Sequence, residues 1–195
     1  IYAYSTNGDL TYVLLKRTPF YYESGGQIAD IGIIQNENIS LDVLDVQKID
    51  DKICHICKIR KGDVDSFNHE YVQAEINLDR RKKIMSNHTA THLLHKALKN
   101  VLGDHVQQAG SLVNDKKLRF DYTHSQKISE SDINSIETEV NEIIKSNTSL
   151  NKEIKSYDEA ISDGAEALFG EKYGESVRVV SISDYSKELC GGTHV

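Results

Sequence analysis

Two pairs of metal-ligand side chains, far apart in the sequence, limit most strongly what this chain can fold into. The stretch NHTATHLLHKAL places His88 and His92 four positions apart, and LCGGTHV places Cys190 and His194 at the same spacing. Each spacing can bring two side chains to one point, and four such groups make up the usual tetrahedral set for zinc. If the fold joins the two pairs, the site is built by tertiary structure. Such a site is a candidate active site rather than a local zinc finger.

Length and composition describe an ordinary globular chain. Its 195 residues are 38% hydrophobic and 27% charged, enough for one large domain or two small ones. No apolar run approaches the length that spans a membrane, and no signal peptide is recognisable. The three cysteines do not suggest a disulfide scaffold, so we expect a reducing, cytoplasmic compartment. The chain begins without Met and ends one residue after His194, so we expect a segment of a longer protein.

The charge is distributed unevenly along the chain. The net charge is −7, yet residues 76–127 carry 10 Lys and Arg against 4 Asp and Glu. The basic residues of this segment form two clusters, at 80–83 and at 116–119. A basic segment inside an acidic chain is typical of a site-specific contact with a polyanion. A solvated helix end and hairpin turn would account for the same pattern equally well.

The pattern of apolar residues predicts an α+β fold. Short β-branched runs separated by turn residues indicate a small barrel or curled sheet over 1–76, with strands at 11–17, 28–35, 39–49 and 52–60. A helix over about 80–102 follows, capped by Asp79 or an earlier residue and ended by Gly103. We then expect a hairpin turning near Asn114, a helix capped by Ser129, a strand at 150–156, a short helix at 158–163, a Gly-rich loop and a strand at 177–182. The domains expected are therefore a barrel-like, β-rich subdomain (1–76) and a two-layer α/β core (77–195) that contains the zinc site.

Helical geometry places the histidines of the first pair away from the expected core. At about 100° per residue, His88, His92 and His95 lie within about 60° of one another, while the apolar residues lie on the opposite side. We therefore expect the histidines to face a cleft or solvent, with His95 more often solvated than bound.

Several classes of site are excluded by the same residues. A zincin protease needs Glu after the first His, where this chain has Thr89, and a nucleoside deaminase needs a Pro-Cys-x-x-Cys motif that is missing. The Gly pair in FYYESGGQ is not followed by the Lys of an ATP-binding loop. Cys54 and Cys57 are expected to be structural thiols, because residues three apart on a strand face opposite sides.

The chain resembles a known family, the editing domain of alanyl-tRNA synthetase and its free-standing AlaX-type relatives (the threonyl and alanyl tRNA synthetase second additional domain). The stretches that carry the resemblance are RTPFYYESGGQIADIG, NHTATHLLHKAL, GSLVNDKKLRFDYTH, GAEALFGEKYGESVRVV and ELCGGTHV. They cover most of the chain in the order of the family. The ALFGEKYG stretch resembles the full synthetase more than the free-standing proteins, so an excised editing domain is expected.

The resemblance implies a function and a set of residues. It implies hydrolysis of the ester that joins a wrong amino acid, serine or glycine, to alanine tRNA, and a zinc ion held by His88, His92, Cys190 and His194. The amino-acid recognition positions that it implies are Thr91, Gln108 and Ser111. The implied partners are mischarged alanine tRNA and the remaining domains of the parent synthetase, without a membrane.

Two questions stay open on the sequence alone. Four protein ligands usually mark a structural zinc site, whereas a catalytic site keeps a position for water. Zinc therefore either activates water with one ligand loose, or shapes the pocket and orients the substrate. We favour the second, because no Glu or Asp is evident beside either pair as a general base. The alternatives for the function are a free-standing trans-editing protein and a non-catalytic tRNA-binding module with a structural zinc.

Overall fold

The protein is an α+β chain with mostly antiparallel sheets, as the sequence predicts. The computed structural model describes residues 1–63, 71–167 and 173–195, so part of the expected Gly-rich loop and of the ALFGEKYG stretch lies outside the described residues. The chain divides into two compact units, Ile1–Lys83 and Ile84–Val195. No helix in the described ranges is long and apolar enough to cross a membrane.

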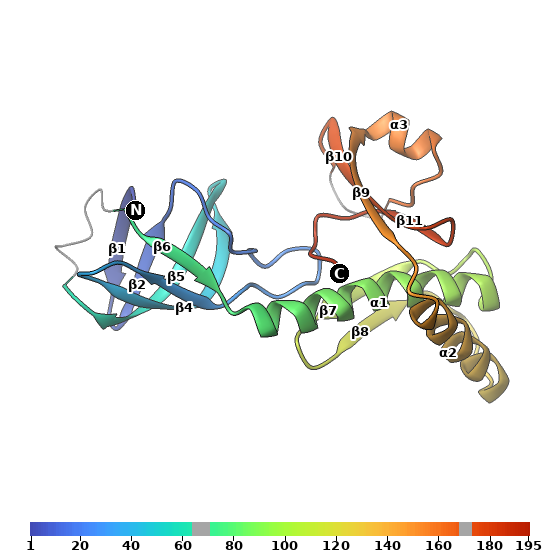
Figure 1. The fold of residues 1–195 in the computed structure, drawn as a ribbon. Coiled ribbons are helices and arrows are strands. Elements are labelled where there is room, and N and C mark those ends of the chain that lie inside the picture. Colours follow the sequence, from blue (N-terminus) through green and yellow to red (C-terminus); the bar gives the residue numbers. More distant parts are fainter. Residues whose placement is uncertain (64–70, 168–172) are drawn as a thin grey trace. The chain divides into compact units, whose positions relative to one another are not determined.

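The first unit is built on one six-stranded sheet (Figure 1). Its strands pair in the order β1-β2-β5-β4-β3-β6, and every pair is antiparallel. The strands are β1 (Ala3–Asn7), β2 (Leu10–Leu14), β3 (Gly32–Gln35), β4 (Ser40–Ile49), β5 (Lys52–Lys61) and β6 (Gln73–Ile76). Four of them coincide with the runs expected from the sequence, and closure into a barrel stays a prediction.

The core of this unit follows from the alternation of apolar residues. Val13, Ile34, Leu41 and Val46 are fully buried, together with Cys57. His55 is buried in the same sheet and has a partner on each ring nitrogen: Nδ1 donates to the Val13 carbonyl at 2.9 Å, and Nε2 lies 2.7 Å from the Thr18 hydroxyl. Because a carbonyl only accepts, the proton sits on Nδ1 and Nε2 accepts from Thr18. The neutral ring is thus satisfied at both ends.

Helix α1 (Leu78–Leu102) is the element on which the second unit is assembled. The Asn77 side chain accepts from the backbone N–H of Arg80 at 3.0 Å, so Asn77 is the cap that the sequence placed at Asp79 or earlier. Gly103 ends the helix with φ of 112°, a conformation that favours glycine. Leu93, Ala97 and Leu98 of the predicted apolar face are buried as expected.

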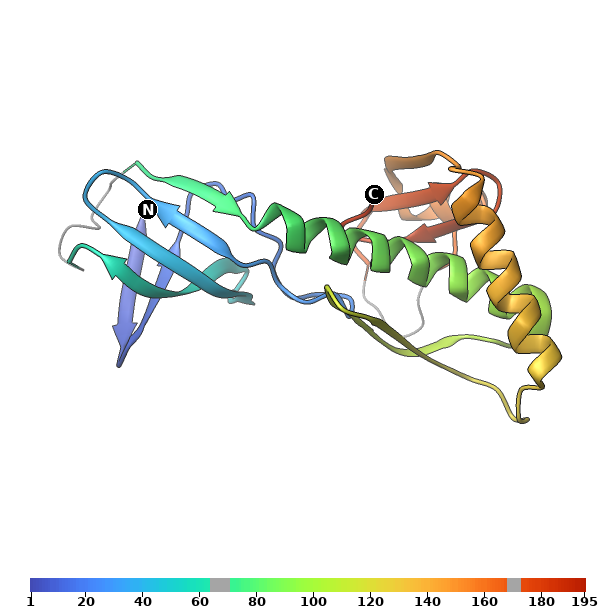
Figure 2. The same cartoon turned by 60° about the horizontal axis from the view of Figure 1, so that its bottom comes forward.

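Two small sheets lie on different sides of α1 in both views (Figures 1 and 2). The hairpin of β7 (Gln108–Val113) and β8 (Leu118–Tyr122) runs along one side, with its turn at Asn114 as expected. The sheet on the other side has the order β11-β10-β9, from β9 (Leu150–Ser156), β10 (Ser176–Ile182) and β11 (Ser186–Leu189). The sequence did not predict β11. This strand leads directly to Cys190 and the end of the chain.

Two shorter helices complete the second unit. Helix α2 (Glu130–Lys145) begins at Ser129, whose side chain accepts from the backbone N–H of Asp132, which is the predicted cap. Its Ile136 packs into a core with Ala97, Leu98 and Val106. Helix α3 (Tyr157–Ser162) lies against β9 and β10, one residue from the expected position.

The buried His55 provides the first prediction. Burial lowers the pKa of His55 below its ordinary value of 6.5, although the hydrogen bond to Val13 opposes this. Above pH 6.5 the ring is neutral in both the folded and the unfolded state. As the pH falls below 6.5, the unfolded ring takes up a proton that the folded ring resists, so stability is lost until the folded pKa is reached.

We therefore expect His55→Gln to be less stable than wild type near pH 8 but to lose less stability between pH 7 and pH 5. The measurement is urea unfolding at several pH values, and the histidines of the second unit are the same in both proteins. Parallel pH profiles for the two proteins would contradict the assignment.

Candidate metal centre

Four ligand side chains from the two ends of the second unit meet at one point. His88 and His92 come from α1, and Cys190 and His194 come from the segment after β11. One ligand atom from each side chain lies within 4.8 Å of all the others. The Cys190 Sγ lies 3.4 Å from His88 Nε2 and 3.3 Å from His194 Nε2. The group can hold a metal ion, and the fold joins the two pairs as the sequence required.

The spacing of the ligand atoms fits a tetrahedral ion of zinc size. Bonds of about 2.0–2.1 Å to nitrogen and about 2.3 Å to sulfur place neighbouring ligand atoms about 3.3–3.6 Å apart around a tetrahedron. The measured separations from Cys190 Sγ fall within that range or close to it. The imidazole rings of His88 and His194 are also close, with centroids 4.4 Å apart. The four ligand atoms are therefore close enough together to hold one ion.

The electrostatics of the group suit metal ligation. Burial lowers the pKa of His88 to about 3, and burial also lowers the pKa of His92 and of His194. The three rings are therefore neutral at physiological pH, as ligands must be. Burial raises the pKa of the Cys190 thiol to about 11, and the Gly192 N–H that donates to its sulfur opposes that rise. A bound cation is the partner that would stabilise the thiolate.

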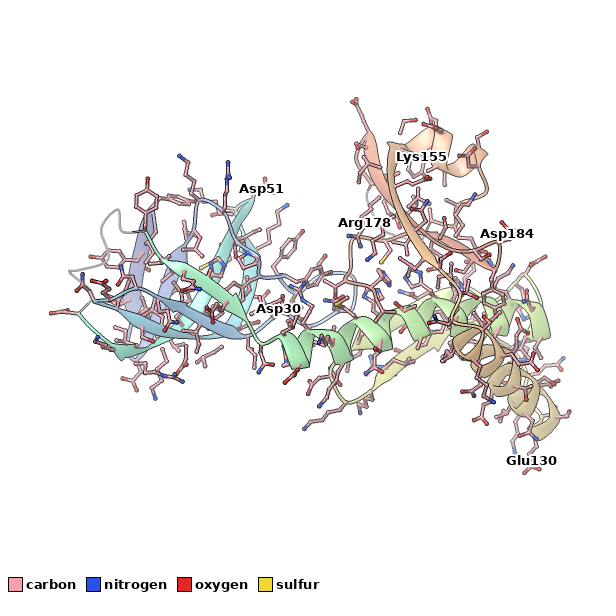
Figure 3. All side chains as sticks on the ribbon, in the orientation of Figure 1. Asp30, Asp51, Glu130, Lys155, Arg178 and Asp184 are labelled. Carbon is pink, nitrogen blue, oxygen red and sulfur yellow. The ribbon has the colours of Figure 1, made fainter. Side chains whose placement is uncertain are left out.

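The loop that carries Cys190 and His194 is held by three side chains. Arg178, labelled on β10 in Figure 3, donates through Nε to the Cys190 carbonyl at 2.8 Å and through its Nη2 to the Gly192 carbonyl. The Lys152 ammonium donates to the His194 carbonyl at 3.2 Å. Thr89, the residue that excluded a zincin, contacts His194 Nδ1 at 3.2 Å and accepts from the N–H of Val195. Both ends of the ligand loop are thus fixed.

Glu188 is the site residue that sequence reasoning missed. It is 6% exposed, and its carboxylate lies between two histidines of α1, 3.4 Å from His92 Nδ1 and 3.0 Å from His95 Nδ1. An acidic residue therefore does lie beside the ligands, although both of its oxygens face histidine rings. The sequence Glu188-Leu189-Cys190 contains the signal for this position. Residues two apart on an extended strand face the same side, so Glu188 lies on the side of Cys190.

His95 also differs from expectation. The sequence favoured a solvated side chain, whereas the structure buries His95 at 4% exposure against Glu188 and the ring of Phe120. The histidine face of α1 is covered because the unpredicted strand β11 lies over it. Helical angles show which residues share a face, but not whether another segment covers that face.

Thr91 is buried on α1 beside the ligands, at 4% exposure. Its hydroxyl donates to the Asn87 carbonyl at 2.8 Å. The hydroxyl proton is therefore engaged, and the oxygen keeps capacity to accept a hydrogen bond from another group.

Gln108 and Ser111 lie three positions apart on β7, which in a regular strand would put them on opposite faces. The pairing of β7 with β8 shifts register between Gln108 and Gly110, so Ala109 is an extra residue at a bulge. As a result Gln108 pairs with Tyr122 and Ser111 pairs with Phe120. Tyr122 and Phe120 are two apart on one strand and therefore share a face, and Phe120 contacts His95 of α1 at a centroid distance of 5.2 Å. The hairpin thus turns the face of Gln108 and Ser111 towards α1.

The basic segment is partly occupied by contacts within the chain. Arg81 pairs with the buried Asp30, and Arg80 donates to the Ala29 carbonyl at 2.7 Å. Lys116 and Lys117, at the hairpin turn, are exposed. Cys54 and Cys57 are buried in the first unit and are not members of the ligand group found in the described residues.

Comparisons with known proteins agree with this arrangement. A model of class II tRNA synthetases (A) matches residues 2–80, and a model of the threonyl and alanyl tRNA synthetase second additional domain matches residues 177–195. An alanine–tRNA ligase from Thermoanaerobacter is 54% identical over 188 residues, which is 96% of this chain and 21% of that protein. Alanine–tRNA ligases from Acetivibrio thermocellus and Clostridioides difficile are 53% and 49% identical, again over 96% of this chain and 21% of theirs.

The two family models together fit a segment of an aminoacyl-tRNA synthetase that includes at least part of the second additional domain. The chain fits a fragment of alanyl-tRNA synthetase, and the resemblance given by its motifs is confirmed. It spans about a fifth of the length of these relatives.

The four ligand side chains provide the second prediction. We expect the chain to bind one Zn²⁺. Substituting a residue that only supports a metal ligand lowers the affinity by roughly 10–100-fold. Cys190→Ala removes a direct ligand, so its affinity for Zn²⁺ should fall by more than that. Competition with a chromophoric chelator measures the affinity. Cys54→Ala, which removes a buried thiol of the first unit, is the matched control and should bind as wild type does. Equal binding by Cys190→Ala would remove the thiol from the site.

Proposed function

We propose that this segment hydrolyses the ester of alanine tRNA that carries serine or glycine, in a pocket that contains zinc. The observation that carries the proposal is the group of His88, His92, Cys190 and His194, with all three histidines buried, in a chain related over 96% of its length to alanine–tRNA ligases.

The need for hydrolysis follows from the limits of binding. An alanine pocket cannot strongly reject glycine, which is smaller, or serine, which adds one hydroxyl. Discrimination by one small group is worth about 1–3 kcal/mol, which is too little for accurate translation. A second site that accepts the wrong amino acid and hydrolyses it supplies the missing selectivity.

Zinc fits this pocket, and when bound it supplies a positive charge that polarises or orients a substrate group. The residues of the chain do the remaining work. Arg178, Lys152 and Thr89 hold the ligand loop in place, and burial keeps the histidines neutral. Glu188 is an unsuitable general base, because both of its oxygens face histidines. This arrangement favours a zinc ion that positions the substrate.

Thr91, Gln108 and Ser111 are our candidates for recognising the amino acid. The Thr91 oxygen can accept a hydrogen bond because its proton is held by Asn87. Gln108 and Ser111 share the face of the hairpin that is turned towards α1. A serine hydroxyl would satisfy such polar groups, whereas alanine would leave one of them without a partner. The exposed Lys116 and Lys117 suit contacts with the tRNA backbone.

The third prediction concerns the reaction itself. We expect the chain to deacylate seryl-tRNA of the alanine isoacceptor much faster than alanyl-tRNA, and Cys190→Ala to abolish the activity because zinc is lost. Thin-layer separation of labelled aminoacyl-adenosine measures the rate, and Cys54→Ala is the control. Bound tRNA with no turnover would favour a non-catalytic module with a structural zinc. Near-normal activity of Cys190→Ala would remove zinc from the mechanism.

The fourth prediction concerns selectivity. Gln108→Ala should lower the ratio of seryl to alanyl hydrolysis by about 5- to 10-fold, the value of one hydrogen bond of about 1–1.5 kcal/mol. The ratio of kcat/KM for the two substrates is the measurement. Gln107→Ala removes the exposed neighbouring side chain and should leave the ratio unchanged. An equal effect of both substitutions would indicate that the hairpin has been distorted, and would count against a specific contact.

A further inference from the structure

A series of polar side chains, buried at Glu188 and His95 and partly exposed at Lys99 and Glu166, continues from the ligand group into the second unit. Glu188 stands between His92, which is a ligand, and His95, which is not. The other ring nitrogen of His95 lies 3.9 Å from the Glu166 carboxylate, which accepts from the Lys99 ammonium at 2.6 Å. The proposed reaction uses none of these contacts directly.

Backbone hydrogen bonds hold the segment at residue 166 against β11, the strand that carries Glu188. Residue 166 is held beside β11 by two backbone hydrogen bonds, from its own N–H to the Lys187 carbonyl and from the Leu189 N–H to its carbonyl, both 2.9 Å. These bonds fix Glu166 and Glu188 on neighbouring backbone segments opposite α1. His95 lies one helical turn beyond His92, so one carboxylate can contact both rings.

The geometry resembles the way proteins orient metal-binding histidines. A ligating imidazole binds the metal through one nitrogen and donates through the other to a carboxylate, a carbonyl or a hydroxyl. His194 follows this pattern, with Nε2 towards Cys190 and Nδ1 towards Thr89. His92 directs Nδ1 towards a Glu188 carboxylate oxygen at 3.4 Å, so the group that faces its second ring nitrogen is a buried carboxylate.

We propose that Glu188 is a positioning residue, which fixes the tautomer and orientation of His92 for zinc and is itself held in place by His95. The proposal rests on the proposed function only in requiring that zinc binds to the four ligands. The carboxylate is buried at 6% exposure and both oxygens face histidine rings, so it acts through His92 and not on a substrate. As an anion beside the ligands, it also strengthens the attraction for a divalent cation.

The decisive variant is Glu188→Gln, which keeps the shape of the side chain and removes its charge. We expect its affinity for Zn²⁺ to fall about 10- to 100-fold, the usual effect of losing a carboxylate behind a ligating histidine. Substituted Co²⁺ should show a shifted visible absorption band, because the orientation of one ligand changes. His95→Gln should have a smaller effect in the same direction. Glu153→Gln changes an exposed glutamate of β9 and is the matched control.

Thermal unfolding separates positioning from a purely structural role. With positioning, Glu188→Gln lowers the unfolding temperature of the zinc-loaded chain and leaves that of the zinc-free chain nearly unchanged. Equal losses in both forms, with wild-type zinc affinity and an unshifted Co²⁺ band, would overturn the proposal. If Glu188→Gln does not fold, unchanged affinity in both His95→Gln and Glu188→Asp overturns it. A wild-type chain that binds no Zn²⁺ would instead overturn the proposed function.

Discussion

The convergence of α1 and the last residues of the chain onto one point is the constraint on which the second unit depends. His88 and His92 are fixed by the helix, whereas Cys190 and His194 arrive after two further helices and five strands. The intervening elements must therefore return the chain to the middle of α1. Strand β11 accomplishes this return, and Arg178, Lys152 and Thr89 hold the loop that follows it. Without these contacts the second pair of ligands would have no fixed position.

The site concentrates polar groups where a stable core would place apolar ones. Four histidines, Thr91 and Glu188 are all less than a tenth exposed around one end of β11. Burying a polar group without a partner costs several kcal/mol, so such a cluster persists only when its members satisfy one another or a ligand. The partners of Glu188, His194 and Thr91 are other site residues or the helix backbone. Buried clusters of polar side chains break the usual rules of core packing, and such exceptions are typical of functional sites.

Local signals in the sequence predicted most of the elements. The Ser129 cap, the turn at Asn114, the Gly103 stop and the apolar stripe of α1 all act over a few residues, so their outcome is decided by nearby chemistry. The spacing within each ligand pair is also a local signal, whereas the joining of the two pairs depends on the fold. What the sequence did not predict depends on tertiary pairing. The burial of His95 requires β11, and the bulge at Ala109 requires the pairing of β7 with β8.

In the proposed reaction, zinc would either activate the attacking water or orient the ester. Activation of water needs an open position on the metal, and therefore one ligand that is loosely held. The natural candidate is the Cys190–His194 loop, because it is the part of the ligand group outside helices and strands. Yet Arg178 binds two of its carbonyls, Lys152 binds a third, and Thr89 contacts the His194 ring. With Glu188 committed to His92 and His95, neither a loose ligand nor a nearby carboxylate base is evident among the described residues. The contacts therefore favour a zinc ion that holds the substrate while the attacking water is activated by another group.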